Sequence, residues 1–289
     1  MQYIGNVIRP PSEADSIILQ VTVGCSYNRC TFCGVYKDIP FSIKPQKTIL
    51  EDLKFASSHC RRQKRMFLVD GDVLILSQKK LIYYFQLINK YLPWVSRISL
   101  YGNAKAIRNK TVADLSELKE LGLNRIYMGL ESGCDDILQS VQKGVSIQNI
   151  IEVAKKVKEC GIFLSVSVLL GLGGIENSIR HAIDTAKTLN QMEPGQIGAL
   201  TYMPLDNTVL GQEVKNGIFT IPAPSIILQE LYLLVNHLDL KRCQFHANHA
   251  SNYLPIVGRL PRDKKSLLTS IDMALQGILP LVPEHKRAL

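Results

Sequence analysis

The sequence predicts an α/β fold in which parallel strands alternate with helices and curl into a barrel. Short β-rich runs recur at intervals of 28 to 49 residues, which is the length of a strand followed by a crossover helix. Among the 289 residues 46% are hydrophobic and 20% are charged, so the chain can bury a large core and is not an extended disordered protein. Several strands also alternate apolar with polar residues, which favours a barrel that holds a ligand.

Six strands are expected, each a short run rich in β-branched and aliphatic residues. The intervals between them have helical periodicity, so each strand and the helix after it form a βα unit. The strands begin near Ile17, Met66, Arg97, Arg125, Ile162 and Gln196.

Three of the helices carry start or stop signals in the sequence. We expect a capping box between Thr48 and Glu51 at the start of the first helix. The other two helices have a polar residue before their first turn and a glycine after their last turn. These pairs are Thr111 with Gly122 and Ser146 with Gly161.

Strand parity favours a closed barrel over an open, doubly wound sheet. A doubly wound sheet is covered by helices on both faces, so its strands read as nearly continuous apolar runs. Here Ser165 and Ser167 alternate with aliphatic residues in one strand, as Ser99 and Tyr101 do in another. The alternative, in which a few serines lie in the core bonded to the backbone, stays open. In the strand at 125–131 the mixed face carries Arg125, Tyr127, Gly129 and Glu131.

The pattern changes beyond Tyr202. A segment rich in turn residues leads to an apolar helix expected at 225–240 and to a last helix around 266–276. Nothing between these parts resembles an interdomain linker. We therefore predict a core barrel at 1–205 and a C-terminal helical extension at 206–289 that packs on it.

The chain carries 34 lysines and arginines against 25 acidic residues, a net charge of +9. The densest basic run is at 61–65, which ordinarily would be a solvated face, with an acidic partner or nucleic acid as the alternative. No apolar run reaches the roughly 18 residues of a membrane span, and the first residues do not resemble a secretory signal. We therefore expect a cytoplasmic protein without membrane association.

Three of the seven cysteines lie within nine residues, at Cys25, Cys30 and Cys33. An odd cysteine count without a secretory signal argues against a disulfide framework and favours metal ligation or redox chemistry. A structural zinc site needs four ligands, and no fourth cysteine or histidine lies at a suitable spacing. A 4Fe-4S cluster with three cysteine ligands would leave one iron open at the end of the first strand.

This cysteine loop resembles the cluster loop of radical S-adenosylmethionine (SAM) enzymes, with Phe32 as the aromatic residue before the last cysteine. The segment RIYMGLESGCDDILQSVQK at 125–143 resembles the branch that includes oxygen-independent coproporphyrinogen dehydrogenases and methylthiotransferases. The resemblance runs from about residue 17 to residue 205. One feature departs from the family: four residues separate Cys25 from Cys30, where the common motif has three.

The resemblance implies a partial (β/α)6 TIM-like barrel that binds a 4Fe-4S cluster and SAM. It also implies reductive cleavage of SAM to a 5′-deoxyadenosyl radical, which abstracts hydrogen from an unidentified small molecule or RNA. A flavodoxin or a ferredoxin would supply the electron. The alternatives are a non-catalytic iron–sulfur or zinc module that binds nucleic acid through its basic surface, and, ranked last, a Rossmann-fold methyltransferase.

The resemblance also assigns residues to the cofactor. The three cysteines would bind the cluster, and the segment Asp70-Gly71-Asp72 would hold the methionine amino group, with a plain turn as the alternative. Glu131 would contact the ribose or methionine end, with a salt-bridged carboxylate as the alternative. The adenosine contacts would be Phe32, Ser165, Ser167, Gly171 and Tyr202, the last of which reads equally well as a core residue.

A polar stretch near the end of the chain is the best candidate for binding substrate. Two imidazoles and two amides within eight residues are costly to bury without partners, so they would face a polar cavity or lock the tail onto the barrel. The candidate substrate residues are Tyr101, His246, Asn248, His249 and Asn252.

Overall fold

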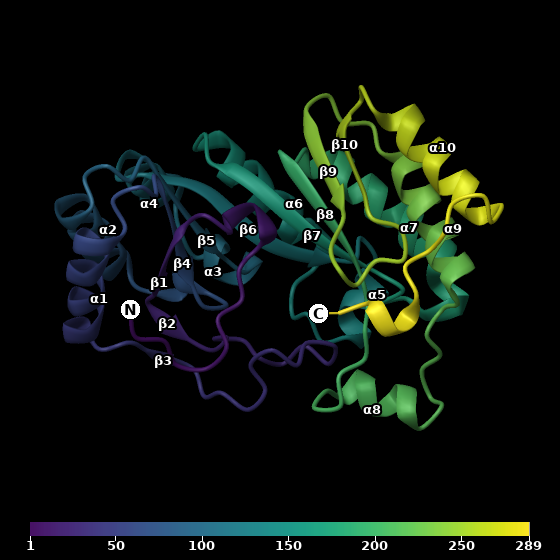
Figure 1. Cartoon of the computed structure of the whole chain (residues 1–289), viewed down its shortest axis with the longest axis horizontal. Coiled ribbons are helices and arrows are strands. Elements are labelled where there is room, and N and C mark those ends of the chain that lie inside the picture. The colour runs from purple at the N-terminus through teal and green to yellow at the C-terminus, as the bar shows by residue number, and fades with distance from the viewer. Residues whose placement is uncertain (289) are drawn as a thin grey trace. The chain divides into compact units, whose positions relative to one another are not determined.

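The computed structural model describes residues 1–288. Its strands are β1 (Ile17–Gln20), β2 (Thr22–Val23), β3 (Ser42–Ile43), β4 (Arg65–Val69), β5 (Arg97–Tyr101), β6 (Leu123–Glu131), β7 (Phe163–Leu170), β8 (Gln196–Thr201), β9 (Cys243–Ala247) and β10 (Ile256–Leu260). Eight of them form one sheet in the order β1-β4-β5-β6-β7-β8-β9-β10 (Figure 1). The pairs β1–β4, β4–β5, β5–β6, β7–β8 and β8–β9 are parallel, and β9–β10 is antiparallel. The predicted α/β class is confirmed.

Helices connect the parallel strands, as the sequence predicts. They are α1 (Gln46–His59), α2 (Gln78–Tyr91), α3 (Ala104–Arg108), α4 (Val112–Glu120), α5 (Asp135–Ser140), α6 (Ile147–Glu159), α7 (Gly174–Met192), α8 (Val209–Lys215), α9 (Pro224–His237) and α10 (Lys264–Leu275). No helix among residues 1–288 is both long enough and apolar enough to cross a membrane.

The chain divides into two compact units, and each is described here by itself. The first unit comprises residues 1–28, 35–128 and 155–164, and the second comprises 29–34, 129–154 and 165–289. The division predicted at residue 205 stays a prediction.

In the first unit, the mixed face of the sheet is filled by aromatic residues. Phe67 meets Tyr101 and Tyr127 edge-on, with ring centroids 4.9 and 5.6 Å apart. The Tyr127 hydroxyl donates a 2.7 Å hydrogen bond to Glu13, which is completely buried. Ser99 on the same face is also buried, and its hydroxyl has no hydrogen-bond partner, so it is not a backbone-bonded core serine.

The second unit extends the sheet beyond the six predicted strands. Strand β9 pairs in parallel with β8, and β10 pairs antiparallel with β9 through Ile256–Ala247 and Leu260–Cys243. The sequence analysis expected only a polar stretch in this region. The two predicted C-terminal helices are confirmed as α9 and α10, and α9 packs against α7.

The helix starts agree with the sequence at two of three places. Thr111 caps α4 in a reciprocal capping box with Asp114, and α6 begins directly after Ser146. The capping box expected at Thr48 was wrong, because α1 begins two residues earlier with Pro45 at its N-cap and no side-chain cap. Proline fixes the backbone for an early helix start, so a hydroxyl cap at Thr48 is not needed.

Candidate active site

The loop that carries the three cysteines is shared between the two units. Cys25 belongs to the first unit, and Cys30 and Cys33 belong to the second. All three are half-buried thiols rather than disulfides. In the second unit, the backbone of Thr31 bonds both to the Val141 carbonyl and to the Leu210 amide, each at 3.0 Å, which fixes the loop between Cys30 and Cys33.

Three thiols on a loop of nine residues are the donor set of an iron–sulfur cluster. Among residues 1–288, no three histidine, cysteine, aspartate or glutamate side chains are grouped to hold a single metal ion. We therefore test the fit of the cofactors within each unit separately.

In the first unit, two buried carboxylates follow strand β4. Asp70 accepts a 3.2 Å hydrogen bond from the Gly24 amide, and Asp72 accepts 2.6 Å hydrogen bonds from Ser26 and Asn103. In both aspartates these bonds use only the Oδ2 atom. The Oδ1 atom of each is buried without a hydrogen-bond partner.

The environment of these carboxylates is unfavourable for negative charge. Burial raises the pKa of Asp72 to about 6, against the opposing effect of its hydrogen bonds. Burial also raises the pKa of Asp70 above its ordinary value. Two buried carboxylate oxygens without donors, next to the segment that carries Cys25, fit a cationic ligand such as the amino group of SAM.

Gly71 brings this turn against the cluster loop. A β-carbon added at Gly71 would lie 2.9 Å from the Tyr36 ring and 3.3 Å from the β-carbon of Cys25. The structure therefore brings together the predicted segment 70–72 and the first cysteine. The plain-turn alternative does not account for the two unpaired oxygens.

In the second unit, Glu131 ends strand β6 and forms an ion pair with Lys143 at 2.7 Å. Both side chains are mostly buried, and the Glu131 backbone has a φ of +65°, which is strained for a residue other than glycine. A β-carbon at Gly129 would lie 2.0 Å from the Glu131 carboxylate, so a larger residue there would require the Glu131 side chain to move. The salt-bridged carboxylate weighed as an alternative is therefore present.

Lys143 is a functional candidate that the sequence analysis missed. Burial alone would lower the pKa of Lys143, but the Glu131 carboxylate raises it above its ordinary value. The thiols of Cys30 and Cys33 add to this effect. The Lys143 ammonium also lies 5.9 Å from the centre of the Phe32 ring. Its only sequence signal is its place at the end of the segment that carries the family resemblance.

The predicted adenine contacts share one hydrophobic cluster in the second unit. Tyr202 at the end of β8 is buried with Leu172 from the turn after β7, and Phe32 from the cysteine loop packs against them. These three side chains come from distant parts of the chain. Tyr202 is thus a core residue, as its alternative interpretation expected, and adenine binding beside Phe32 stays a prediction.

The predicted ribose contacts lie on β7 in the same unit. Ser165 is buried and donates a 3.3 Å hydrogen bond to Gln196, whereas Ser167 is half-buried. Gly171 follows the strand with a φ of +81°, and its amide donates a 2.9 Å hydrogen bond to Glu230.

The predicted substrate residues are divided between the two units, and their common role stays a prediction. Tyr101 lies in the first unit, and His246 lies on β9 in the second. Asn248 is exposed, and His249 bonds to Ser251 at 2.9 Å. Asn252 acts as the lock that we weighed against a substrate role, because its amide bonds to the Thr201 hydroxyl and to the carbonyls of Ala199 and Ala247.

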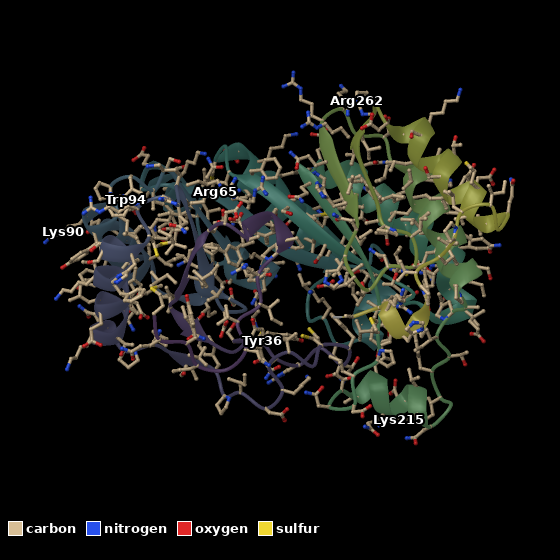
Figure 2. The ribbon with its side chains drawn as sticks, in the orientation of Figure 1. Tyr36, Arg65, Lys90, Trp94, Lys215 and Arg262 are labelled. Carbon is tan, nitrogen blue, oxygen red and sulfur yellow. The ribbon has the colours of Figure 1, made fainter. Side chains whose placement is uncertain are left out.

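The basic run at 61–65 lies at the amino-terminal end of β4, opposite to the end that carries Asp70. Arg61 stacks on Trp94 at 5.2 Å, and Arg65 pairs with the exposed Asp15 at 3.2 Å. Figure 2 labels Arg65, Lys90 and Trp94 within this unit. The contacts are those of a solvated face.

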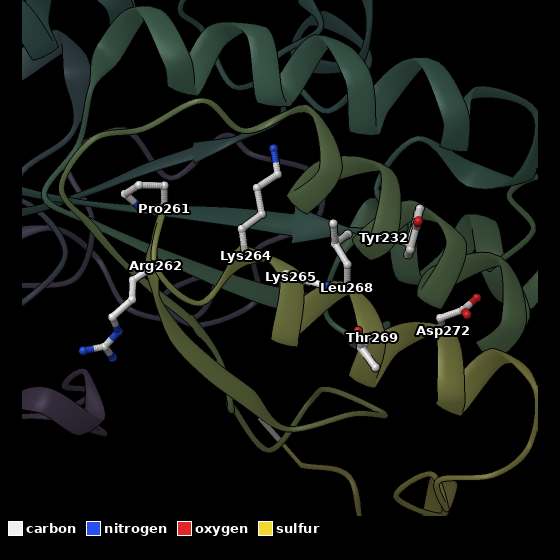
Figure 3. Close-up of a pocket in the computed structure, with 8 residues that line it drawn as sticks. All are labelled: Tyr232, Pro261, Arg262, Lys264, Lys265, Leu268, Thr269 and Asp272. Carbon is white, nitrogen blue, oxygen red and sulfur yellow. The ribbon is translucent and has the colours of Figure 1, made fainter.

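A pocket of about 450 Å³ opens between α9 and α10 in the second unit (Figure 3). Two of its three cationic groups have partners, since Arg262 pairs with Asp263 and Lys264 bonds to the Leu238 carbonyl. None of the predicted site residues lines it. The lining residues are Tyr232, Pro261, Arg262, Lys264, Lys265, Leu268, Thr269 and Asp272.

The sheet is mostly parallel, three thiols follow strand β2, and two buried carboxylates follow strand β4. This arrangement is the one expected of an iron–sulfur enzyme. The family model of the Radical SAM superfamily matches residues 19–187, more than half of the chain. The chain therefore belongs to the radical SAM superfamily, and its cofactors are a 4Fe-4S cluster and SAM.

Comparisons with individual proteins agree with this assignment. The 4′-phospho-dehydrooxetanocin synthase of Priestia megaterium is 22% identical over 249 residues, which cover 76% of this chain and 33% of that protein. The chain spans about a third of the length of the first curated relatives that it matches.

Two solved structures share the fold. The radical SAM methyltransferase TsrM from Kitasatospora setae, with cobalamin and a 4Fe-4S cluster bound, has a TM-score of 0.57 at 15% identity, covering 72% of this chain and 41% of its own. Methylornithine synthase (PylB) has a TM-score of 0.56 at 15% identity, covering 92% and 82%. The predicted partial TIM-like barrel is confirmed by this shared fold.

Radical SAM enzymes in general act with a reductant and a substrate, and the chain belongs to this class of enzymes. This membership favours an enzyme over the non-catalytic metal module that the sequence left open. The matching family model is also not that of a Rossmann-fold methyltransferase.

Proposed function

We propose that Cys25, Cys30 and Cys33 bind the cluster and that the enzyme abstracts a hydrogen atom from its substrate. When bound, the cluster and SAM supply reductive cleavage of the sulfonium to a 5′-deoxyadenosyl radical. The observation that carries the proposal is the pair of buried, unpaired oxygens on Asp70 and Asp72. The residues of this chain would bind and orient SAM and exclude water around it.

The residues of the first unit would bind the amino group of SAM. In the first unit, Asp70 and Asp72 accept hydrogen bonds from the amino group, and Gly71 allows the backbone to approach Cys25 closely. The electrostatic gain on binding an ammonium group offsets the unfavourable burial of the two carboxylates.

The second unit would hold the carboxylate and the adenosine. Lys143 provides a mostly buried cation for the carboxylate of SAM, and Glu131 orients that cation while it accepts a hydrogen bond from the ribose. Phe32 and Tyr202 enclose the adenine, and Ser165 with Ser167 contributes hydroxyl groups towards the ribose.

The substrate is a small molecule or RNA, and the reductant is a flavodoxin or a ferredoxin. These partners and a cytoplasmic location are parts of the proposal that rest on the family resemblance and the net charge of +9. Tyr101 and His246 remain the candidate substrate contacts, with Asn248 and His249.

The proposal is tested with anaerobically reconstituted protein. Wild type is expected to contain about four irons per chain and to form 5′-deoxyadenosine from SAM on reduction with dithionite. Cys33→Ala is expected to lose at least 100-fold of that product, because the cluster loses a ligand. Cys60→Ala is the matched control, since Cys60 is an equally half-buried but isolated thiol. Equal effects of the two substitutions would contradict the proposal.

A further inference from the structure

Glu230 of helix α9 is a completely buried carboxylate that the proposed function does not use. It lies outside the part of the chain that the family model matches. Its Oε1 atom accepts a 2.9 Å hydrogen bond from the Gly171 amide and lies 2.9 Å from Nδ1 of His181, and its Oε2 atom accepts a 2.7 Å bond from Ser178. A buried carboxylate is costly unless donors surround it, and here each oxygen has at least one.

These contacts fix the peptide bond that ends strand β7. The carbonyl of Leu170 accepts a 2.9 Å hydrogen bond from the Tyr202 amide, and the next amide, of Gly171, donates to Glu230. Ile227, one turn before Glu230, covers the same place, because a β-carbon on Gly171 would lie 2.7 Å from it. Helix α9 therefore holds the peptide through a hydrogen bond and covers it with an apolar side chain.

The peptide held in this way leads directly into the adenosine side of the site. Leu172, the next residue, is buried in the cluster that also contains Tyr202 and contacts Phe32. The segment before α9 covers the same turn, since a β-carbon on Gly174 would lie 3.4 Å from the Phe219 ring. A displacement of Gly171 would therefore be transmitted to the side chains that enclose the adenine.

We propose that Glu230 is a positioning residue for SAM: it holds the Gly171 amide so that the turn from Gly171 to Gly174 is preformed for adenosine. This inference rests on the proposed function, because it assumes that adenosine binds at this turn. It assigns to the C-terminal segment a part in cofactor binding rather than a purely structural part.

The test compares loss of the whole carboxylate with loss of one of its other hydrogen bonds. Glu230→Met removes the bonds from Gly171 and Ser178 and the contact with His181 at similar side-chain volume, whereas Ser178→Ala removes the Ser178 bond and leaves the Gly171 bond in place. The measured quantity is the SAM concentration at which the change in the electron paramagnetic resonance spectrum of the reduced cluster is half complete. We expect Glu230→Met to raise this concentration about tenfold. The iron content should be unchanged, and Ser178→Ala should shift the value less than twofold. Equal shifts in both variants, or none in either, would overturn the inference.

If Glu230→Met fails to fold, Glu230→Gln replaces it. Its amide oxygen still accepts from Gly171 but without the charge, so the expected rise is about threefold and still exceeds that of Ser178→Ala. A rise no larger than that of Ser178→Ala would overturn the inference.

Hydrogen–deuterium exchange separates this inference from the proposed function. In wild type the 169–175 segment should exchange slowly, and in the Glu230 variant its exchange should accelerate at least tenfold. Unchanged exchange would overturn the inference even if wild type binds SAM. Failure of wild type to respond to SAM would contradict the proposed function, and accelerated exchange in the variant would then show that Glu230 holds the turn without positioning SAM.

Discussion

The burial of Asp72 lowers the stability of the folded protein. Its carboxylate is completely buried, and burial raises its pKa from the ordinary 3.8 to about 6. The folded state therefore binds a proton more tightly than the unfolded state. At neutral pH the difference between the two pKa values corresponds to a destabilisation of about 3 kcal/mol. A bound ammonium group would remove part of this cost.

We predict that the stability of the cofactor-free protein falls between pH 4 and pH 6, because in this range Asp72 has lost its proton in the unfolded state but still holds it in the folded state. In Asp72→Asn this contribution is absent, so the unfolding free energy of the variant relative to wild type should rise by about 2–3 kcal/mol across that window. Urea unfolding at pH 4.5 and pH 7 measures the difference. A difference between the two proteins that is independent of pH would show that the pKa of Asp72 is the same in the folded and the unfolded protein.

At the residue scale, the sequence indicated site residues that directly follow strands. It did not indicate residues that reach the strand ends from other elements of the fold. Asp70 and Asp72 were predicted from the resemblance to radical SAM enzymes, which implies that the segment after the second predicted strand holds the methionine amino group. Lys143 and Glu230 were not predicted, because Lys143 pairs with Glu131, 12 residues away, and Glu230 bonds to Gly171, 59 residues away. No local sequence pattern indicates such a pair. Both become visible only when the fold brings the partner to the end of its strand.

At the scale of elements, two threonines provide a direct comparison of a predicted cap with an observed one. Thr111 accepts a 3.0 Å hydrogen bond from the Asp114 amide, and Asp114 accepts a 2.8 Å bond from the Thr111 amide. Thr48 lies inside the first turn of α1, whose start has no side-chain cap.

We predict that Thr111→Ala lowers the unfolding free energy by about 1 kcal/mol, because it removes the cap of α4. Thr48→Ala should change it by less than about 0.5 kcal/mol, because alanine suits a helix and no capping bond is lost. Chemical unfolding of both variants at one pH gives the comparison. A loss in Thr48→Ala as large as that in Thr111→Ala would contradict the observed start of α1.

The elements that the sequence predicted are those with strong apolar periodicity. Strands β4 to β8 and helices α9 and α10 were found because their buried residues form continuous or regularly spaced runs. Strands β9 and β10 were missed because Gln244 and His246 interrupt the first, and Gly258 and Arg259 interrupt the second. These short strands are stabilised by strand pairing rather than by their own composition, β9 with β8 and β10 with β9.

At the scale of the whole molecule, the net charge of +9 favours an acidic electron donor, but the donor docks at one place on the surface. Electron transfer falls steeply with distance, so a productive donor must dock near the cysteine loop. The basic run at 61–65 is at the amino-terminal end of β4, whereas Asp70 and Asp72 follow its carboxyl end. A strand of five residues separates these ends by on the order of 16 Å.

We therefore predict that the cation beside the cluster loop matters more for reduction than the basic run. Arg29 is exposed and directly precedes Cys30, and Arg62 is exposed within the run. With flavodoxin as the reductant at low salt, Arg29→Glu should lower the rate of 5′-deoxyadenosine formation about tenfold, and Arg62→Glu less than twofold. With dithionite neither variant should differ from wild type. Added salt should slow the flavodoxin-driven rate of wild type, because it screens the attraction between exposed charges. A loss in Arg62→Glu that equals the loss in Arg29→Glu, or one that persists with dithionite, would show that the donor does not dock at the loop.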